Sequence, residues 1–106
     1  MIPASLGDKP QVLVTVFDES TLAESLKAAV ELRTVGLRTV VYPEADKMGK
    51  QFKFADKLVI PVAVILGPDE LANGQVAVKN LKTREQVVVD RKDMAAQVKK
   101  FLPSLP

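Results

Sequence analysis

Four lysines recur at helical spacing in the stretch "ADKMGKQFKFADK", residues 45 to 57, so their ammonium groups could bind one ligand together. They are Lys47, Lys50, Lys53 and Lys57. At about 100° per residue, the four fall within an arc of roughly 120° on one side of a helix. Ammonium groups along one helix edge, beside the helix N-terminus, can bind phosphate groups. The solvated face of an ordinary amphipathic helix has the same pattern, and from the residues alone that interpretation is favoured.

The other side of this predicted helix is apolar, and we expect it to pack on a sheet. Its residues recur at i, i+4, i+7 and i+11, and they are Met48, Phe52, Ala55 and Val59. Phe54 falls among the lysines instead. There an exposed ring could stack on a base of RNA, or it could simply pack against Leu58. Gly49 lies in the first turn, where it lowers helix stability but lets another backbone approach.

Two pairs of acidic residues follow predicted strands, at the edge where open α/β sheets bind ligands. Asp18 and Glu19 come after the first strand, and Asp69 and Glu70 come after the third. A phosphate-accepting receiver domain with a magnesium pocket is disfavoured, because the end of the third strand, where its acceptor aspartate should lie, is Leu66. For Asp18 and Glu19 we favour helix capping and a favourable interaction with the helix dipole.

Glu70 can be interpreted in two ways: it could cap a single helical turn in its loop, or it could contact RNA. A carboxylate repels phosphate, but it can read a base by accepting hydrogen bonds from amino or imino groups. Lys79 lies on the outer side of the alternation formed with Val76 and Val78. It is either an ordinary solvent-facing lysine or a second contact on the same rim as Glu70.

Composition excludes several kinds of chemistry. The chain has no cysteine and no histidine, so disulfides, thiolate chemistry, histidine base catalysis and the usual zinc ligand sets are excluded. Its five glycines never form a GxGxxG or Walker spacing. The net charge is +2, but residues 1 to 46 carry −3 and residues 47 to 106 carry +5. This asymmetry fits an anionic partner on the second half.

The elements around these residues alternate in a way that predicts an α/β fold. Strands are predicted at residues 11–17, 38–42, 62–66, 75–81 and 85–89. Helices are predicted after the "DEST" segment as far as Gly36, over residues 47–58, and after Asp90 and Asp93, which can cap the last one. That last helix should face inward with Met94, Val98, Phe101 and Leu102. The order βαβαβ, a hairpin and a helix predicts parallel strands with right-handed crossovers and one antiparallel strand.

The length of 106 residues fits one domain. We expect residues 1–10 to be a linker or flexible N-terminus, and residues 11–106 to form the domain. The beginning "MIPASLGDKPQ" lacks the features of a signal peptide, and no apolar run is long enough for a membrane span. A cytoplasmic location without membrane contact is therefore expected.

Three segments carry a family resemblance. They are "GKQFKFADK", "VAVILGPDELANGQVAVKNL" and "TREQVVV". In this order they resemble the C-terminal anticodon-binding domain of class IIa aminoacyl-tRNA synthetases, over about Gln11 to Leu102. The details "KQFKFADK" and "KTREQ" are most similar to the bacterial-type histidyl enzymes. The threonyl, prolyl and glycyl enzymes share the domain and its GxxE turn.

The resemblance implies a three-layer α/β/α fold with a mixed five-stranded sheet. It also implies that Lys47, Gly49 and Lys50 begin a helix facing an anticodon loop, that Glu70 reads an anticodon base, and that Lys79 lies on the adjacent strand. Some relatives have a polar residue just before the helix, and Ala45 departs from that pattern. With two further residues of the lysine helix included, the predicted RNA-binding set is Lys47, Gly49, Lys50, Lys53, Phe54, Glu70 and Lys79.

The same resemblance implies the partners. They are a tRNA anticodon stem-loop, that of tRNA-His with anticodon GUG for a histidyl enzyme, and the catalytic domain of a homodimeric parent. The chain has no class II catalytic features, so we expect no activity and no cofactor for it alone. ATP and magnesium would belong to the parent's catalytic domain. An alternative is a free-standing interaction or dimerisation domain with the same fold, and a gel shift with an anticodon hairpin separates these hypotheses.

Overall fold

The computed structural model describes residues 10–42 and 47–102, so residues 1–9 of the expected linker and Ala45 lie outside the described residues. Five strands form one sheet in the order β2-β1-β3-β4-β5. Their bounds are β1 Val12–Val14, β2 Thr39–Val41, β3 Val62–Ile65, β4 Gln75–Asn80 and β5 Gln86–Asp90. Strand β1 pairs in parallel with β2 and β3, whereas β4 is antiparallel to both β3 and β5. The predicted mixed sheet with one antiparallel strand is confirmed.

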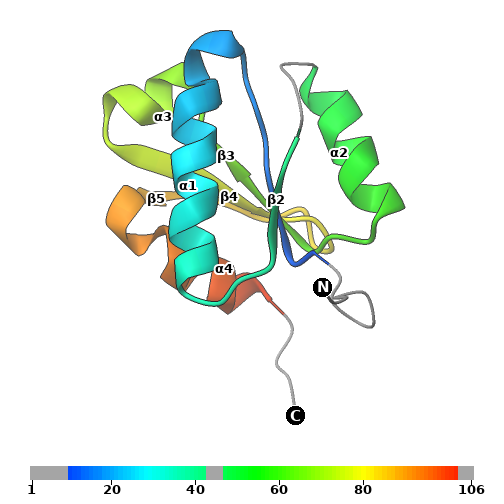
Figure 1. Ribbon diagram of the computed structural model, residues 1–106. Coiled ribbons are helices and arrows are strands. Elements are labelled where there is room, and N and C mark those ends of the chain that lie inside the picture. The colour runs from blue at the N-terminus through cyan, green and yellow to red at the C-terminus, as the bar shows by residue number, and fades with distance from the viewer. Residues whose placement is uncertain (1–9, 43–46, 103–106) are drawn as a thin grey trace, which may run out of the picture.

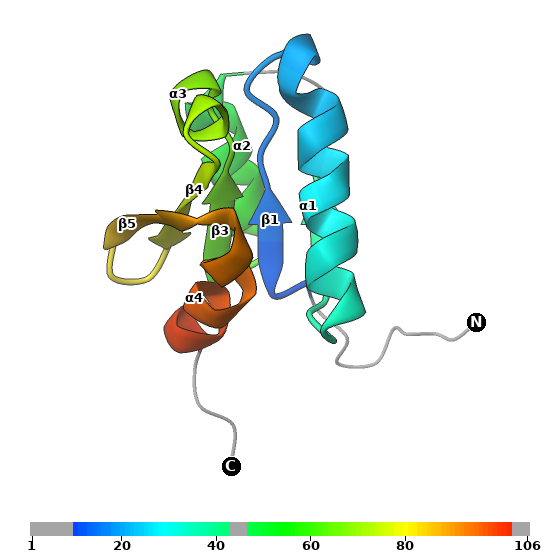
Figure 2. The ribbon, with the colours of Figure 1, turned by 90° about the vertical axis from the view of Figure 1, so that its left-hand side faces the viewer.

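Helices cover both faces of this sheet and make three layers. Helices α1 (Leu22–Thr34) and α4 (Met94–Phe101) pack on one face, and α2 (Met48–Lys57) packs on the other. The short helix α3 (Pro68–Ala72) connects β3 to β4. In Figure 1, α2 stands apart from α1 with the sheet between them, and in Figure 2, α4 lies in front of the sheet and α2 behind it. The expected α/β/α arrangement is confirmed.

Strand β1 is buried on both faces, as its run of valines predicts. Val12 and Val14 contribute to the larger core cluster under α1 and α4, and Leu13 contributes to the smaller cluster under α2. Edge strand β5 is covered on one face only. Val87 and Val89 on that face pack against the larger cluster, while Val88 on the other face is exposed. The core thus lies mainly between the sheet and the pair α1 and α4.

The predicted caps differ in outcome. Asp18 begins a 3₁₀ turn (Glu19–Thr21) that leads into α1, and its Oδ1 accepts a hydrogen bond from the Thr21 N–H at 3.1 Å. The Asp18 N–H in turn donates to Thr21 Oγ1 at 3.2 Å, so the capping interpretation of Asp18 is confirmed. Asp90 and Asp93 occupy the starts of the last 3₁₀ turn and of α4, but neither side chain caps them, and that expectation was wrong.

The inward residues of α4 were predicted correctly. Met94 and Val98 are buried, and Phe101 and Leu102 are half-buried against the same cluster. None of the helices in the described part of the chain is long and apolar enough to cross a membrane.

Two residues of α2 and its end depart from the predicted apolar stripe. Val59 is 69% exposed and has a left-handed backbone with φ of 57°, just after α2 ends at Lys57. Gln51, which is outside the predicted stripe, is completely buried. Ala55 is buried as expected, and Phe52 is half-buried.

Candidate nucleic-acid interface

The carboxyl ends of the parallel strands bring three segments to one edge of the domain. Because β1 pairs with β3 in parallel, the loop after β1 and the turn that begins α3 lie at the same edge. Helix α2 also starts at this edge, which is at the top of Figure 1. We call this side of the domain the carboxyl edge.

The beginning of α2 carries a basic hollow at this edge. A surface hollow of about 480 Å³ is lined by Lys47, Gly49, Lys50 and Lys53. All four residues are exposed, so the structure brings together the predicted basic residues of the helix start. Lys57, the fourth lysine of the pattern, lies in the last turn of α2 and is also exposed. A Cβ added at Gly49 would meet nothing within 4 Å, so the packing of the described chain does not require glycine there.

A buried glutamine fixes α2 against the end of β1. Gln51 Oε1 accepts a hydrogen bond from the Val16 N–H at 2.8 Å, and Gln51 Nε2 donates to the Val16 carbonyl at 2.8 Å. Both residues are completely buried, so these bonds are shielded from water. These two bonds fix the position of α2 relative to the carboxyl edge. Gln51 belongs to neither the lysine set nor the apolar stripe read from the sequence, so this contact was not predicted.

The aromatic residues of α2 are both used within the domain. Phe54 contacts Tyr42 edge to face, with ring centroids 5.3 Å apart, and packs on the smaller core cluster. Phe54 is therefore half-buried instead of fully exposed among the lysines, and the chain after β2 supplies its aromatic partner. Phe52 lies under the ammonium of Lys79, whose Nζ is 4.6 Å from the ring centroid.

Lys79 lies on the α2 side of the sheet. It pairs with Ala63 near the start of β3, four residues beyond Gln75, where β4 begins. At about 3.4 Å per residue, its backbone lies roughly 13 Å along the strand from the carboxyl edge. The Phe52 ring holds its ammonium by a cation–π contact. Its charge therefore extends the basic surface of α2 across the sheet rather than adding to the rim at Glu70.

The turn that begins α3 is organised by Glu70. Glu70 Oε1 accepts a hydrogen bond from the Gly67 N–H at 3.1 Å and closes a capping arrangement at the helix start. A Cβ at position 67 would lie 2.5 Å from this oxygen, so a larger residue there would displace the Glu70 carboxylate. Glu70 is half-exposed, and within the described chain its other oxygen, Oε2, accepts no hydrogen bond. The carboxylate is thus fixed by one oxygen and available through the other.

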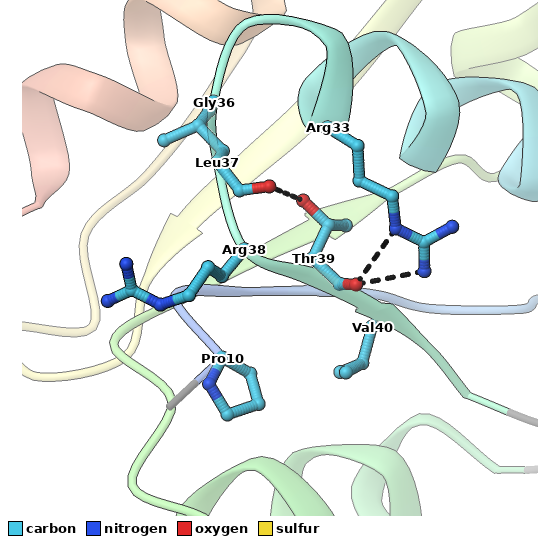
Figure 3. A pocket seen from close by; sticks show the side chains of 7 residues that line it. All are labelled: Pro10, Arg33, Gly36, Leu37, Arg38, Thr39 and Val40. Carbon is cyan, nitrogen blue, oxygen red and sulfur yellow. Dashed lines mark hydrogen bonds between the residues drawn. The ribbon is translucent and has the colours of Figure 1, made fainter. Parts of the chain in front are cut away.

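A second hollow lies at the opposite edge of the sheet, near the start of β2. It has a volume of about 540 Å³ and is lined by Pro10, Arg33, Gly36, Leu37, Arg38, Thr39 and Val40. Figure 3 shows the Arg33 guanidinium against the Thr39 carbonyl, to which its Nε and Nη2 donate at 3.2 and 2.9 Å. The Thr39 hydroxyl donates to the Leu37 carbonyl. These bonds join the end of α1 to β2 and give Arg33 a structural role.

Two ion pairs join α1 to the turn after β5, on the face of the sheet away from α2. Arg91 contacts Glu24 and Glu31 of α1 at 3.4 and 3.0 Å. Glu24 also accepts a hydrogen bond from Lys27. The bond and charge of Lys27, followed by those of Arg91, lower the pKa of Glu24. Within the described residues, no group of three or more potential ligands could hold a metal ion.

The sequence profile of one family, described as an anticodon binding domain, matches residues 11–101. The chain belongs to this family. The anticodon binding domain therefore accounts for all five strands and for the four α-helices of the described chain. The resemblance deduced from the three sequence segments is confirmed.

Histidyl enzymes are among the relatives of this anticodon binding domain. The histidine–tRNA ligase of Stenotrophomonas maltophilia (strain K279a) is 43% identical over 90 residues, which are 85% of this chain and 19% of that protein. The crystal structure of histidyl-tRNA synthetase from Nostoc sp. PCC 7120 has a TM-score of 0.84 and 36% identity, over 87% of this chain and 22% of that one. The chain thus spans about a fifth of the length of these relatives.

The fold is shared more widely. The crystal structure of the RNA binding domain of threonyl-tRNA synthetase from Cryptosporidium parvum Iowa II has a TM-score of 0.79 with 16% identity, over 90% of this chain and 24% of that one. At that identity the likeness concerns the fold alone.

Proposed function

We propose that this domain recognises a tRNA anticodon loop at its carboxyl edge, as the anticodon-binding part of a histidine–tRNA ligase. The observation that supports it best is the coincidence of the family match with a basic hollow on α2 and an available carboxylate on α3 at one edge of the sheet. The identity of 43% with a histidine–tRNA ligase favours the histidyl group over its relatives. The RNA partner in this proposal is the anticodon stem-loop of tRNA-His, with anticodon GUG.

The proposed roles divide by charge. Lys47, Lys50 and Lys53 contact phosphates, because three ammonium groups line one hollow. Glu70 reads a base edge through Oε2, since a carboxylate repels the phosphates of the RNA backbone. Lys79, held on the Phe52 ring, supports the RNA on the sheet face beside α2.

In this proposal the chain has no chemistry of its own. The ligase reaction, with its ATP and magnesium, belongs to a catalytic domain outside this chain, and that domain is expected to be homodimeric. The proposal therefore predicts no histidine-dependent ATP–pyrophosphate exchange by the purified chain. Such exchange would contradict this part of the proposal.

The direct test is binding of fluorescently labelled hairpins. The full chain is titrated with a hairpin that carries the GUG loop and with one that carries an unrelated loop on the same stem. The proposal expects salt-sensitive binding of both and tighter binding of GUG, because phosphate contacts are shared and base contacts are not. Failure to bind either hairpin at low salt would overturn it.

A second candidate function is a protein interaction module. Leu26 and Val30 of α1 are 49% and 58% exposed and line a hollow of about 410 Å³ on the face away from α2. Sedimentation of the chain at rising concentration tests for self-association through this face. A monomer that binds hairpins would leave the RNA-binding proposal as the only one supported.

A further inference from the structure

Phe17 is the exposed phenylalanine of this domain. It is 45% exposed, whereas Phe52, Phe54 and Phe101 are half-buried. Phe52 lies under Lys79, and Phe54 packs on Tyr42. Phe17 lies just beyond β1, at the carboxyl edge, and no core cluster includes it. The sequence pattern had placed it at the end of an apolar strand, which gave no sign of its exposure.

The backbone on both sides of Phe17 is held. Val16 exchanges two hydrogen bonds of 2.8 Å with the Gln51 side chain. On the other side, Asp18 donates its N–H to Thr21 Oγ1 and caps the following turn. An aromatic ring on a fixed backbone has two side-chain torsions to restrict, so it can contact a ligand at low entropic cost.

Phe17 lies between the two parts of the candidate interface. Through Gln51, its neighbour Val16 is bonded to α2 next to Lys50. Thr15 donates its N–H to the Val64 carbonyl of β3 at 2.9 Å, three residues before Gly67. The loop that carries Phe17 is thus connected on one side to the basic hollow and on the other to the turn of Glu70.

We propose that Phe17 stacks on an unpaired base of the RNA loop bound at the carboxyl edge. This inference rests on the proposed function. A base has an apolar face whatever its identity, so stacking fits an exposed phenyl ring and adds affinity without sequence preference. Asp18 and Glu19 follow Phe17 directly, and their charges disfavour a phosphate at this place. The base therefore lies over Phe17, and its phosphates lie toward the lysines of α2.

The chain has no tryptophan, and this makes a direct test possible. In the variant Phe17→Trp, the single indole reports its own surroundings. Titration with the GUG hairpin should change its fluorescence in step with binding, because stacking on a base alters indole emission. Val30→Trp, on the exposed face of α1, is the matched control and should keep its emission. A hairpin whose loop bases are removed, leaving the sugar–phosphate chain, should also leave the emission of Phe17→Trp unchanged.

Affinity gives an independent measurement. Phe17→Ala should weaken hairpin binding by about 5- to 150-fold, the usual worth of one stacked base. The weakening should be similar for the GUG hairpin and for a hairpin with another loop. Phe17→Tyr retains the ring and should bind as the wild type does. Melting curves of all variants check that the domain is folded.

The outcomes separate the two proposals. If the wild-type chain binds hairpins, but Phe17→Ala binds equally well and the emission of Phe17→Trp does not change, the stacking role is overturned and the proposed function stands. If the wild-type chain binds no hairpin, the proposed function fails and stacking fails with it. Binding that weakens for Phe17→Ala, with a fluorescence response in Phe17→Trp and none in Val30→Trp, supports the inference.

Discussion

The carboxylate of Glu70 occupies the space that a side chain at position 67 would need. Its Oε1 accepts the Gly67 N–H at 3.1 Å, and a Cβ at position 67 would approach the same oxygen to 2.5 Å. Gly67 has an ordinary extended backbone, with φ of −80°, so a larger residue there would disturb the contact with Glu70 and not the backbone angle. The GxxE turn therefore fixes one oxygen of the Glu70 carboxylate and leaves the other available.

Gly67→Ala should displace this carboxylate. The side chain of Glu70 can rotate away from the added methyl group, so we expect a decrease of only about 1 kcal/mol in unfolding free energy, the worth of one helix cap. Discrimination between the GUG hairpin and another hairpin should fall at the same time. The double variant Gly67→Ala with Glu70→Gln should lose little beyond the single variants, because both act on one group. Full additivity in hairpin discrimination would show that Gly67 acts independently of Glu70.

Glu70→Gln separates the cap from base reading. The glutamine carbonyl can still accept the Gly67 N–H, so melting should change little, while the other oxygen becomes a donor. Without the charge-assisted hydrogen bond, binding of the GUG hairpin should weaken by about 1–3 kcal/mol. Binding of a hairpin with the wrong loop should hold or improve, because one negative charge is removed. If the ratio of the two affinities is unchanged, Glu70 is a helix cap without a role in recognition.

Lys50 and Lys53 should contribute affinity without specificity. Replacing both by alanine should weaken all hairpins alike and reduce the slope of log affinity against log salt by about 0.7 for each phosphate that is no longer neutralised. The matched control is the pair Lys99→Ala and Lys100→Ala in α4, which removes the same charge from the other face of the sheet. Equal effects of the two pairs would mean that net charge, and not the hollow on α2, attracts the RNA.

Val59→Gly should stabilise the domain. Val59 follows the end of α2 with φ of 57°, and its N–H and that of Ile60 bond back to the Asp56 and Ala55 carbonyls. This is a Schellman ending with valine at the position that glycine usually takes. Relief of the left-handed strain is worth roughly 1–2 kcal/mol, reduced by the greater freedom of unfolded glycine. The net gain expected in thermal unfolding is about 1 kcal/mol, whereas Leu58→Gly, with a right-handed backbone, should destabilise.

Gln51→Leu should be strongly destabilising despite its similar size. It leaves the buried N–H and carbonyl of Val16 without the two bonds of 2.8 Å. At about 1–3 kcal/mol for each of the two unsatisfied groups, we expect a decrease in stability of roughly 2–6 kcal/mol, measured by denaturant unfolding. Gln51→Glu is the informative comparison, since it keeps the acceptor for the Val16 N–H but cannot donate while ionised, so its stability should recover at low pH. A decrease below about 1 kcal/mol for Gln51→Leu would contradict this role.

Local patterns were sufficient for the elements and for part of the site. The valine run of β1, the lysine spacing of α2 and the glycine-containing turn before Glu70 each depend on residues close in the chain, and each was predicted correctly. The spacing of the lysines at three and four residues puts them on one face whatever the rest of the fold does. The family resemblance, carried by short segments, also needed no structure.

Tertiary structure decided which side chains those elements leave available. Phe54 is withdrawn from the lysine face because Tyr42, twelve residues earlier, lies beside it in the folded domain. Gln51 is buried because the end of β1 presents the backbone of Val16 to it, 35 residues away. Phe17 is exposed and belongs to no core cluster, although Val16 beside it is buried against Gln51 of α2. Helical and strand periodicity report the direction of a side chain from its own element, whereas burial depends on which distant element packs against it, and that is settled only when the sheet and helices assemble.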